Sequence, residues 1–243
     1  MSKSKFVSFI TAGDPSLDDT RKFIDVLSEY SDIIELGIPF SDPIAEGEVI
    51  QDANIRALEN GVTADDIFDM LKTVAFDKIV LLTYINPVYV YGRKKFFDKC
   101  KETGVYGVIV PDLPFEERGE IAAYAEDAGV HLITLIAPNS ADRVQMLAEN
   151  ATGFIYLVSS MGTTGTRKQL TIDLTRTISQ IREVTDTPIM VGFGISTPEQ
   201  VAQIGKIADG VIVGSALVRI IAEHGANSRI HLEKELKRMI GNV

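Results

Sequence analysis

Short apolar segments alternate with amphipathic segments along almost the whole chain. Eight apolar segments have the length and the β-branched or aromatic content of strands: residues 6–10, 32–38, 78–84, 107–111, 131–137, 153–158, 188–193 and 210–214. Several are continuous apolar runs, such as 79–82, 108–110 and 211–213. Such runs are typical of parallel strands covered on both faces, and parallel strands need crossover helices.

The segments between these strands repeat apolar residues with the period of an amphipathic helix: 17–30, 64–73, 115–128, 142–150, 174–184 and 198–207. Residues that favour helix N-caps come before several of them: Ser16, Thr63, Ser140, and Ser196 or Thr197. The pattern therefore predicts a helix after most of the strands.

Eight strand–helix units in 243 residues leave about 30 residues for each, the size of a minimal βαβ unit. The economical arrangement is an α/β fold of the (β/α)8 TIM barrel type, with residues 1–243 as a single domain. A doubly wound open sheet is the alternative, but its G-x-G-x-x-G first turn is absent. On a barrel, functional side chains gather where the strands end and in the loops that follow.

An acidic residue interrupts the second strand. Glu35 stands where a buried strand usually has another apolar residue, and Asp42 and Glu46 follow in a Pro- and Gly-containing loop. Because a buried carboxylate is costly unless it is paired, solvated or used in chemistry, Glu35 and a loop acid are candidates for an acid–base pair. The alternative is a strand-end Glu bound by backbone groups beside a solvated acidic loop.

The last three strands end in glycine-rich turns, at residues 162–165, 192–194 and 214–215. Glycine lets the backbone approach a ligand and point N–H groups at it, and Ser215 adds a hydroxyl at the start of a helix. These turns predict a phosphate site, with ordinary turn chemistry as the alternative. Residues 162–167 are a candidate lid, or else a surface loop.

Composition limits the partners and cofactors. The net charge of −10 argues against a general nucleic-acid or anionic-membrane surface. No apolar run approaches the roughly 20 residues that cross a bilayer, and the N-terminus has no signal-peptide pattern. One cysteine, Cys100, and three histidines without ligand spacing predict neither an internal disulfide nor a metal centre. We therefore expect a cytoplasmic protein.

Beyond these patterns, the chain resembles the tryptophan synthase alpha chain family over nearly its whole length. The most specific match is E-L-G-I-P-F-S-D-P-I-A-E-G at 35–47, supported by L-L-T-Y-I-N-P at 81–87, P-D-L-P at 111–114, Y-L-V-S at 156–159 and G-F-G-I-S at 192–196. The resemblance implies a barrel lyase that cleaves indole-3-glycerol phosphate to indole and glyceraldehyde 3-phosphate by a retro-aldol reaction. It implies no cofactor in this chain.

The resemblance also assigns roles to residues. Glu35 becomes the acid and base at indole C3, and Glu46 bonds the indole N–H and stabilises its developing positive charge. Tyr156 helps to place the substrate, although core packing would explain it too. The other implied substrate contacts are Phe9 and Tyr84 in the indole pocket, Thr164 on the lid, and Gly165, Gly194, Gly214 and Ser215 at the phosphate. Asp112 and Asn86 match positions implicated in loop ordering, and Asp42 is left as structural.

Two residues depart from the commonest family pattern. Glu46 stands where most members have Asp, and Glu48 stands where a small residue or Pro is usual. Glu46 keeps the charge but adds a methylene, and a misplacement of about 1 Å can cost up to ~100-fold in rate. Glu48 places a like charge beside Glu46, which can raise the pKa of the pair or disturb the loop.

The family implies a partner, a beta chain that uses pyridoxal phosphate to join indole and serine in an alpha2beta2 heterotetramer. Residues 43–60 and 87–91 would face it, and apolar residues 88–91, expected in a loop, suit a contact surface. Packing on the barrel's own helices is the alternative.

Two other functions fit parts of the sequence. One is a weakly active or inactive alpha-type subunit that binds and activates the beta chain, which the Glu46 and Glu48 pair favours. The other is a different phosphate-binding barrel enzyme, such as an isomerase of the same pathway, but the strand ends carry no lysine.

Overall fold

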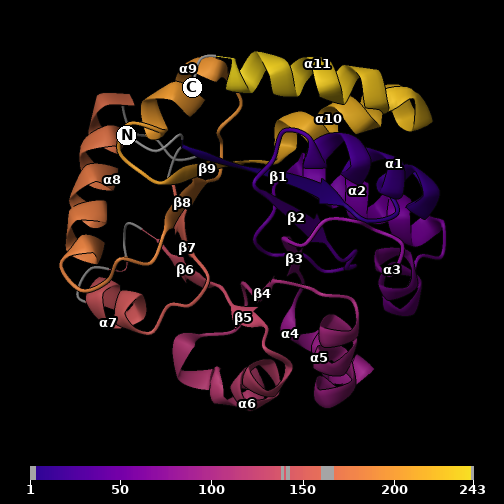
Figure 1. Ribbon diagram of the computed structural model, residues 1–243, viewed down its shortest axis with the longest axis horizontal. Helices are drawn as coiled ribbons and strands as arrows, with labels where there is room; N and C mark the ends of the chain where they lie inside the picture. The colour runs from indigo at the N-terminus through magenta and orange to yellow at the C-terminus, as the bar shows by residue number, and fades with distance from the viewer. Residues whose placement is uncertain (1–3, 138–139, 141–142, 160–166, 242–243) are drawn as a thin grey trace.

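The strands form one parallel sheet that closes into a barrel (Figure 1). The computed structural model describes residues 4–137, 140, 143–159 and 167–241, with the side chains of 167–173 left aside. The strands are β1 Lys5–Thr11, β2 Ile33–Gly37, β3 Ile79–Leu82, β4 Gly107–Ile109, β5 His131–Leu132, β6 Thr134–Ile136, β7 Ile155–Val158, β8 Ile189–Gly192 and β9 Gly210–Val213. Their order is β5-β4-β3-β2-β1-β9-β8-β7-β6. Because β5 and β6 are consecutive in the chain, the two ends of this order meet, and the predicted (β/α)8 barrel is confirmed.

The predicted fifth strand, 131–137, is divided at Ile133 into β5, which pairs with β4, and β6, which pairs with β7. Arg118 explains the division: its guanidinium donates to the Ile133 carbonyl and to Thr134 Oγ1, both at 2.9 Å. The Ile133 N–H still donates to the Val108 carbonyl at 3.0 Å, so the break stays within the barrel wall. The sequence prediction missed this break because a distant side chain satisfies the freed carbonyl.

Helices surround the sheet in Figure 1. They are α1 Leu17–Ser28, α2 Glu48–Glu59, α3 Ala64–Leu71, α4 Ile85–Tyr91, α5 Arg93–Glu102, α6 Gly119–Ala128, α7 Val144–Glu149, α8 Arg167–Arg182, α9 Pro198–Ile204, α10 Ser215–His224 and α11 Ser228–Ile240, with short 3-10 turns η1 Phe115–Glu117 and η3 Gly225–Asn227. The expectation that 88–91 form a loop is wrong, because they lie in α4. No helix in the described part of the chain has the length and apolar character needed to cross a membrane.

Three of the predicted caps are confirmed. Ser16 accepts from the Asp19 N–H, and Thr63 and Thr197 each form a reciprocal capping box with the residue three positions later. Ser140 is not the cap of α7, whose N-cap is Arg143; its hydroxyl instead accepts from the Ala137 N–H at 3.3 Å.

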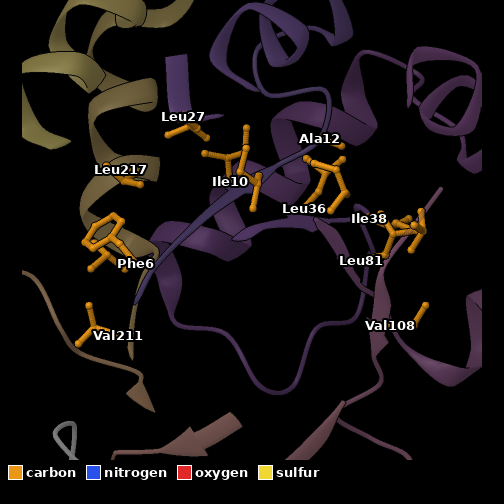
Figure 2. Packing of buried hydrophobic residues seen from close by; sticks show 14 of the residues in the cluster. Phe6, Ile10, Ala12, Leu27, Leu36, Ile38, Leu81, Val108, Val211 and Leu217 are labelled. Atoms are coloured by element: carbon orange, nitrogen blue, oxygen red, sulfur yellow. The ribbon is translucent and has the colours of Figure 1, made fainter. Parts of the chain in front are cut away.

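Apolar side chains form two layers, one on each face of the wall. The inner cluster consists of Val7, Ile33, Val80, Ile109, Ile133, Phe154, Tyr156, Met190 and Ile212, so the barrel interior is filled at this level. Alternate strand residues such as Ile10 and Leu36 face outward and pack against helices, as Figure 2 shows with Leu27 of α1 and Leu217 of α10.

Candidate active site

A pocket of about 840 Å³, its open mouth included, lies at the carboxyl ends of the strands. Its walls come from β1, β2, β3, β7, β9, the segment after β8, the loop before α2 with the first turn of that helix, and the first turns of α10. Seven of the predicted site residues line it: Phe9, Glu35, Glu46, Tyr156, Gly194, Gly214 and Ser215. Residues more than 170 positions apart in the sequence thus meet at one opening.

Glu35 lies in the pocket because of strand register. It pairs with Phe9 of β1 and Val80 of β3, and residues paired across parallel strands point to the same face. Phe9 lines the pocket and Val80 belongs to the inner cluster, so this face is the barrel interior. Glu35 is only 2% exposed, and among the described residues its Oε2 has no hydrogen-bond partner.

Burial raises the pKa of the Glu35 carboxyl to about 8, with repulsion from Glu46 as the smaller cause. At neutral pH, Glu35 is therefore mostly protonated. A neutral carboxyl that faces a pocket and carries a transferable proton is suited to general acid chemistry.

Glu46 is half-buried and is held by Tyr84. The Tyr84 hydroxyl donates to Glu46 Oε2 and accepts from the N–H groups of Ile44 and Ala45, both at 2.9 Å. The Phe40 ring stacks on the Tyr84 ring with centroids 5.1 Å apart. Tyr84 is not among the residues that line the pocket, where we expected it; instead, it fixes the loop that carries Glu46.

Glycines at two strand ends make room for aromatic side chains. A Cβ on Gly192 would lie 2.5 Å from the Tyr156 hydroxyl, and one on Gly37 would lie 3.0 Å from the Phe9 ring. Only glycine at position 192 therefore allows the Tyr156 ring to lie beside Glu35. Burial there, and to a smaller extent the charges of Glu35 and Glu46, raise the pKa of the Tyr156 hydroxyl. For Gly192 the structure shows a packing role that the sequence pattern does not reveal.

Another part of the pocket lining comes from the glycine-rich segment after β8 and from the start of α10. Gly194 and the preceding Phe193 both have left-handed φ values, 73° and 72°. This conformation is costly for Phe, and such strain gathers at functional sites. Gly214 is the N-cap of α10 and Ser215 its first residue, so N–H groups without intrahelical acceptors lie at the pocket edge.

The remaining predicted residues lie elsewhere. Thr164, Gly165 and nearly all of the candidate lid at 162–167 fall outside the described residues. Asp112 accepts from the Ile85 N–H at 3.0 Å and so caps α4, in which Asn86 is exposed. Glu48 is the exposed first residue of α2, a favourable position for an acid at a helix N-terminus. Asp42 is exposed and accepts from the Ser41 hydroxyl.

Phe193 and Arg219 are two of the lining residues to which the sequence analysis assigned no role. Phe193 is the left-handed residue whose ring contacts Tyr156, with centroids 5.7 Å apart. Arg219 lines the pocket from the second turn of α10. The sequence could have indicated Arg219, because it follows Ser215 by four residues and residues four apart share a helix face.

Comparisons with known proteins agree with this geometry. The family model described as tryptophan synthase alpha chain matches residues 1–242. The tryptophan synthase alpha chain of Lacticaseibacillus casei is 42% identical over 238 residues, covering 96% of this chain and 90% of the relative. That of Methanocaldococcus jannaschii is 43% identical, covering 90% and 80%.

Solved structures agree as well. The tryptophan synthase alpha subunit of Campylobacter jejuni has a TM-score of 0.90 at 36% identity, with 98% of this chain and 96% of that chain covered. A chain of the tryptophan synthase complex of Pyrococcus furiosus has a TM-score of 0.88 at 36% identity, covering 99% and 100%. The chain therefore belongs to the tryptophan synthase alpha chain family.

Proposed function

We propose that this protein is the alpha subunit of tryptophan synthase, a lyase that splits indole-3-glycerol phosphate into indole and glyceraldehyde 3-phosphate. The observation that carries the proposal is Glu35, a buried carboxyl with a pKa of about 8 that faces a pocket with a second acid and a backbone anion site. Family membership supports the same reaction.

The chemistry follows from these positions. Glu35, protonated at neutral pH, gives its proton to indole C3, while the Glu46 carboxylate bonds the indole N–H and stabilises the positive ring. The Glu35 carboxylate then takes the proton of the C3′ hydroxyl as the C3–C3′ bond breaks. The bonding electrons return to the ring, which releases indole and the aldehyde and leaves Glu35 protonated again.

Different lining residues place the indole ring and the phosphate of the substrate. Phe9, Leu82 and Ile212 supply apolar walls for the indole ring, and Tyr156 restricts its position beside Glu35. Gly194, Gly214 and Ser215 receive the phosphate. Thr164 and Gly165 are proposed to complete the site from the lid.

The proposed partner is a beta chain that contains pyridoxal phosphate, in an alpha2beta2 assembly of the cytoplasm in which indole passes directly to the partner for tryptophan biosynthesis. Both predicted contact segments expose apolar side chains: Ile44 is 77% and Ile55 52% exposed in one, Tyr89 44% and Val90 80% in the other. One related solved structure is described as an a2b2 complex with mutual activation. We further propose that this chain is a single domain without a cofactor of its own.

An inactive alpha-type subunit is the less favoured function. The Tyr84 hydroxyl binds the carboxylate of the longer Glu46 side chain, and the Glu48 side chain is exposed to solvent.

Indole release from indole-3-glycerol phosphate, with and without a beta chain, tests the lyase. Glu35→Gln should lower kcat by at least about 100-fold, because the proton donor is lost. Glu46→Asp should lower it as well, because the shorter side chain no longer reaches Tyr84. Glu48→Gln is the matched control and should stay within about twofold of wild type. Absence of indole from both wild-type preparations would refute the lyase, and a faster Glu46→Asp enzyme would show that Glu46 is a compromise.

A further inference from the structure

The charges that line the pocket are unevenly distributed. Its described acids, Glu35 and Glu46, come from β2 and the loop after it. The one cationic side chain among the described lining residues is Arg219 of α10, the helix that begins with Ser215 at the proposed phosphate position. The acids and the cation of the described lining thus come from different elements, β2 with its loop for the acids and α10 for the cation.

The position of Arg219 on α10 allows its side chain to reach the start of the helix. Arg219 is one turn after Ser215, and long helical side chains lean toward the N-terminus. Ala216, Leu217 and Val218 are buried against the barrel, whereas Arg219 is exposed at the edge. No ion pair to another described residue is found for Arg219, so its guanidinium is available to a ligand.

The proposed substrate needs such a charge. A phosphate monoester carries close to two negative charges at neutral pH, and it must enter a pocket with the Glu46 carboxylate in a chain of net charge −10. Helix N–H groups supply only partial charge at the helix start. An arginine fork can bind two phosphate oxygens at once and matches the doubly ionised group.

We propose that Arg219 is a specificity-determining residue that binds the substrate phosphate and selects its dianion. This inference rests on the proposed function for the identity of the ligand. In this role Arg219 contacts the phosphate and not the reacting carbon atoms, so it contributes to substrate and product binding rather than to proton transfer.

The test measures binding of glycerol 3-phosphate by calorimetry, which needs no indole chemistry. Wild type, Arg219→Gln and Arg219→Lys are compared with Arg229→Gln, which removes the same charge from an exposed position on α11 outside the pocket. We expect binding about 10- to 100-fold weaker in Arg219→Gln, intermediate in Arg219→Lys, and unchanged in Arg229→Gln.

Two further readouts separate a phosphate contact from a structural effect. Wild type should bind more tightly at pH 7.5 than at pH 5.5, because the second phosphate ionisation lies near 6, and Arg219→Gln should lose most of this difference. In the lyase assay, KM should rise for Arg219→Gln while kcat stays within about threefold.

Binding by Arg219→Gln within twofold of wild type at both pH values would overturn the inference, as would equal weakening in Arg229→Gln. Should wild type release no indole while the Arg219 variants still lose phosphate binding, the proposed reaction fails and the Arg219 contact stands. An unfolding temperature for Arg219→Gln that matches wild type confirms that the comparison is between folded proteins.

Discussion

The Tyr84 hydroxyl joins two segments that are 38 residues apart and decides where the Glu46 carboxylate lies. Its three contacts leave it little freedom, since it donates to the carboxylate and accepts two backbone N–H groups of the same loop. In the proposed reaction, Tyr84 is a positioning residue that acts through Glu46. This contact also accommodates the extra methylene by which Glu46 departs from the common Asp.

Tyr84→Phe should therefore lower kcat for indole release about 10- to 100-fold, because the loop and its carboxylate lose their anchor. Glycerol 3-phosphate binding should not change, since Tyr84 does not line the pocket. Tyr91→Phe is the matched control: the Tyr91 hydroxyl also donates to a carboxylate, that of Asp65, but at the exposed surface. Equal losses in the two variants would mean that the effect is general destabilisation.

At the scale of elements, contacts with neighbouring strands determine which side chain each strand end places in the pocket. β1 and β2 bring Phe9 and Glu35 to one level through their register, and β8 ends at Gly192 so that Tyr156 of β7 can lie across it. The division of the fifth strand belongs to the same scale, because Arg118, from the turn before α6, satisfies the carbonyl that the break frees. Side chains from adjacent elements thus determine local backbone structure.

Gly192→Ala tests the packing of β7 against β8. The new methyl group would lie 2.5 Å from the Tyr156 hydroxyl, so the ring must move away from Glu35. We expect a free energy of unfolding lower by about 1–3 kcal/mol and a clear loss of kcat. Gly119→Ala is the control, because no atom lies within 4 Å of its added Cβ; it should cost little in stability or rate. Normal activity in Gly192→Ala would show that Tyr156 need not lie where the structure has it.

At the scale of the whole molecule, one buried carboxyl couples global stability to pH. The folded-state pKa of Glu35, about 8, is above its ordinary value of 4.5, so the folded protein binds this proton more tightly than the unfolded chain. The proton on Glu35 stabilises the folded state fully below about pH 4.5. This stabilisation is lost as the pH rises from 4.5 to about 8, and stability does not change further through Glu35 above that pH.

Glu35→Gln removes this dependence. Its free energy of unfolding relative to wild type should increase between pH 4.5 and pH 8, by several kcal/mol in total, because each pKa unit corresponds to about 1.4 kcal/mol. Denaturant unfolding at a series of pH values measures the difference. The exposed Glu48→Gln variant should follow the wild-type curve. A constant difference between Glu35→Gln and wild type across this range would mean that the Glu35 pKa is ordinary.

Much of this protein could be predicted from local pattern. Continuous apolar runs indicated parallel strands because burial on both faces demands them, and the caps at Ser16, Thr63 and Thr197 followed because capping acts over three residues. Glu35 was identifiable as a candidate because a charge in an apolar strand is costly.

Tertiary structure alone decided the rest, because the deciding contacts join residues far apart in the chain. The sequence shows an acid at position 46, but only the folded chain brings the Tyr84 hydroxyl to it. Likewise, the sequence alone indicates a turn at Gly192, whereas the fold packs the Tyr156 side chain against it. The sequence also gives no reason to distinguish Arg219 from other surface cations, whereas α10 places it at the pocket. Sequence pattern determines which elements form, since burial and capping act locally, whereas pKa values and pocket charge depend on distances that only packing sets.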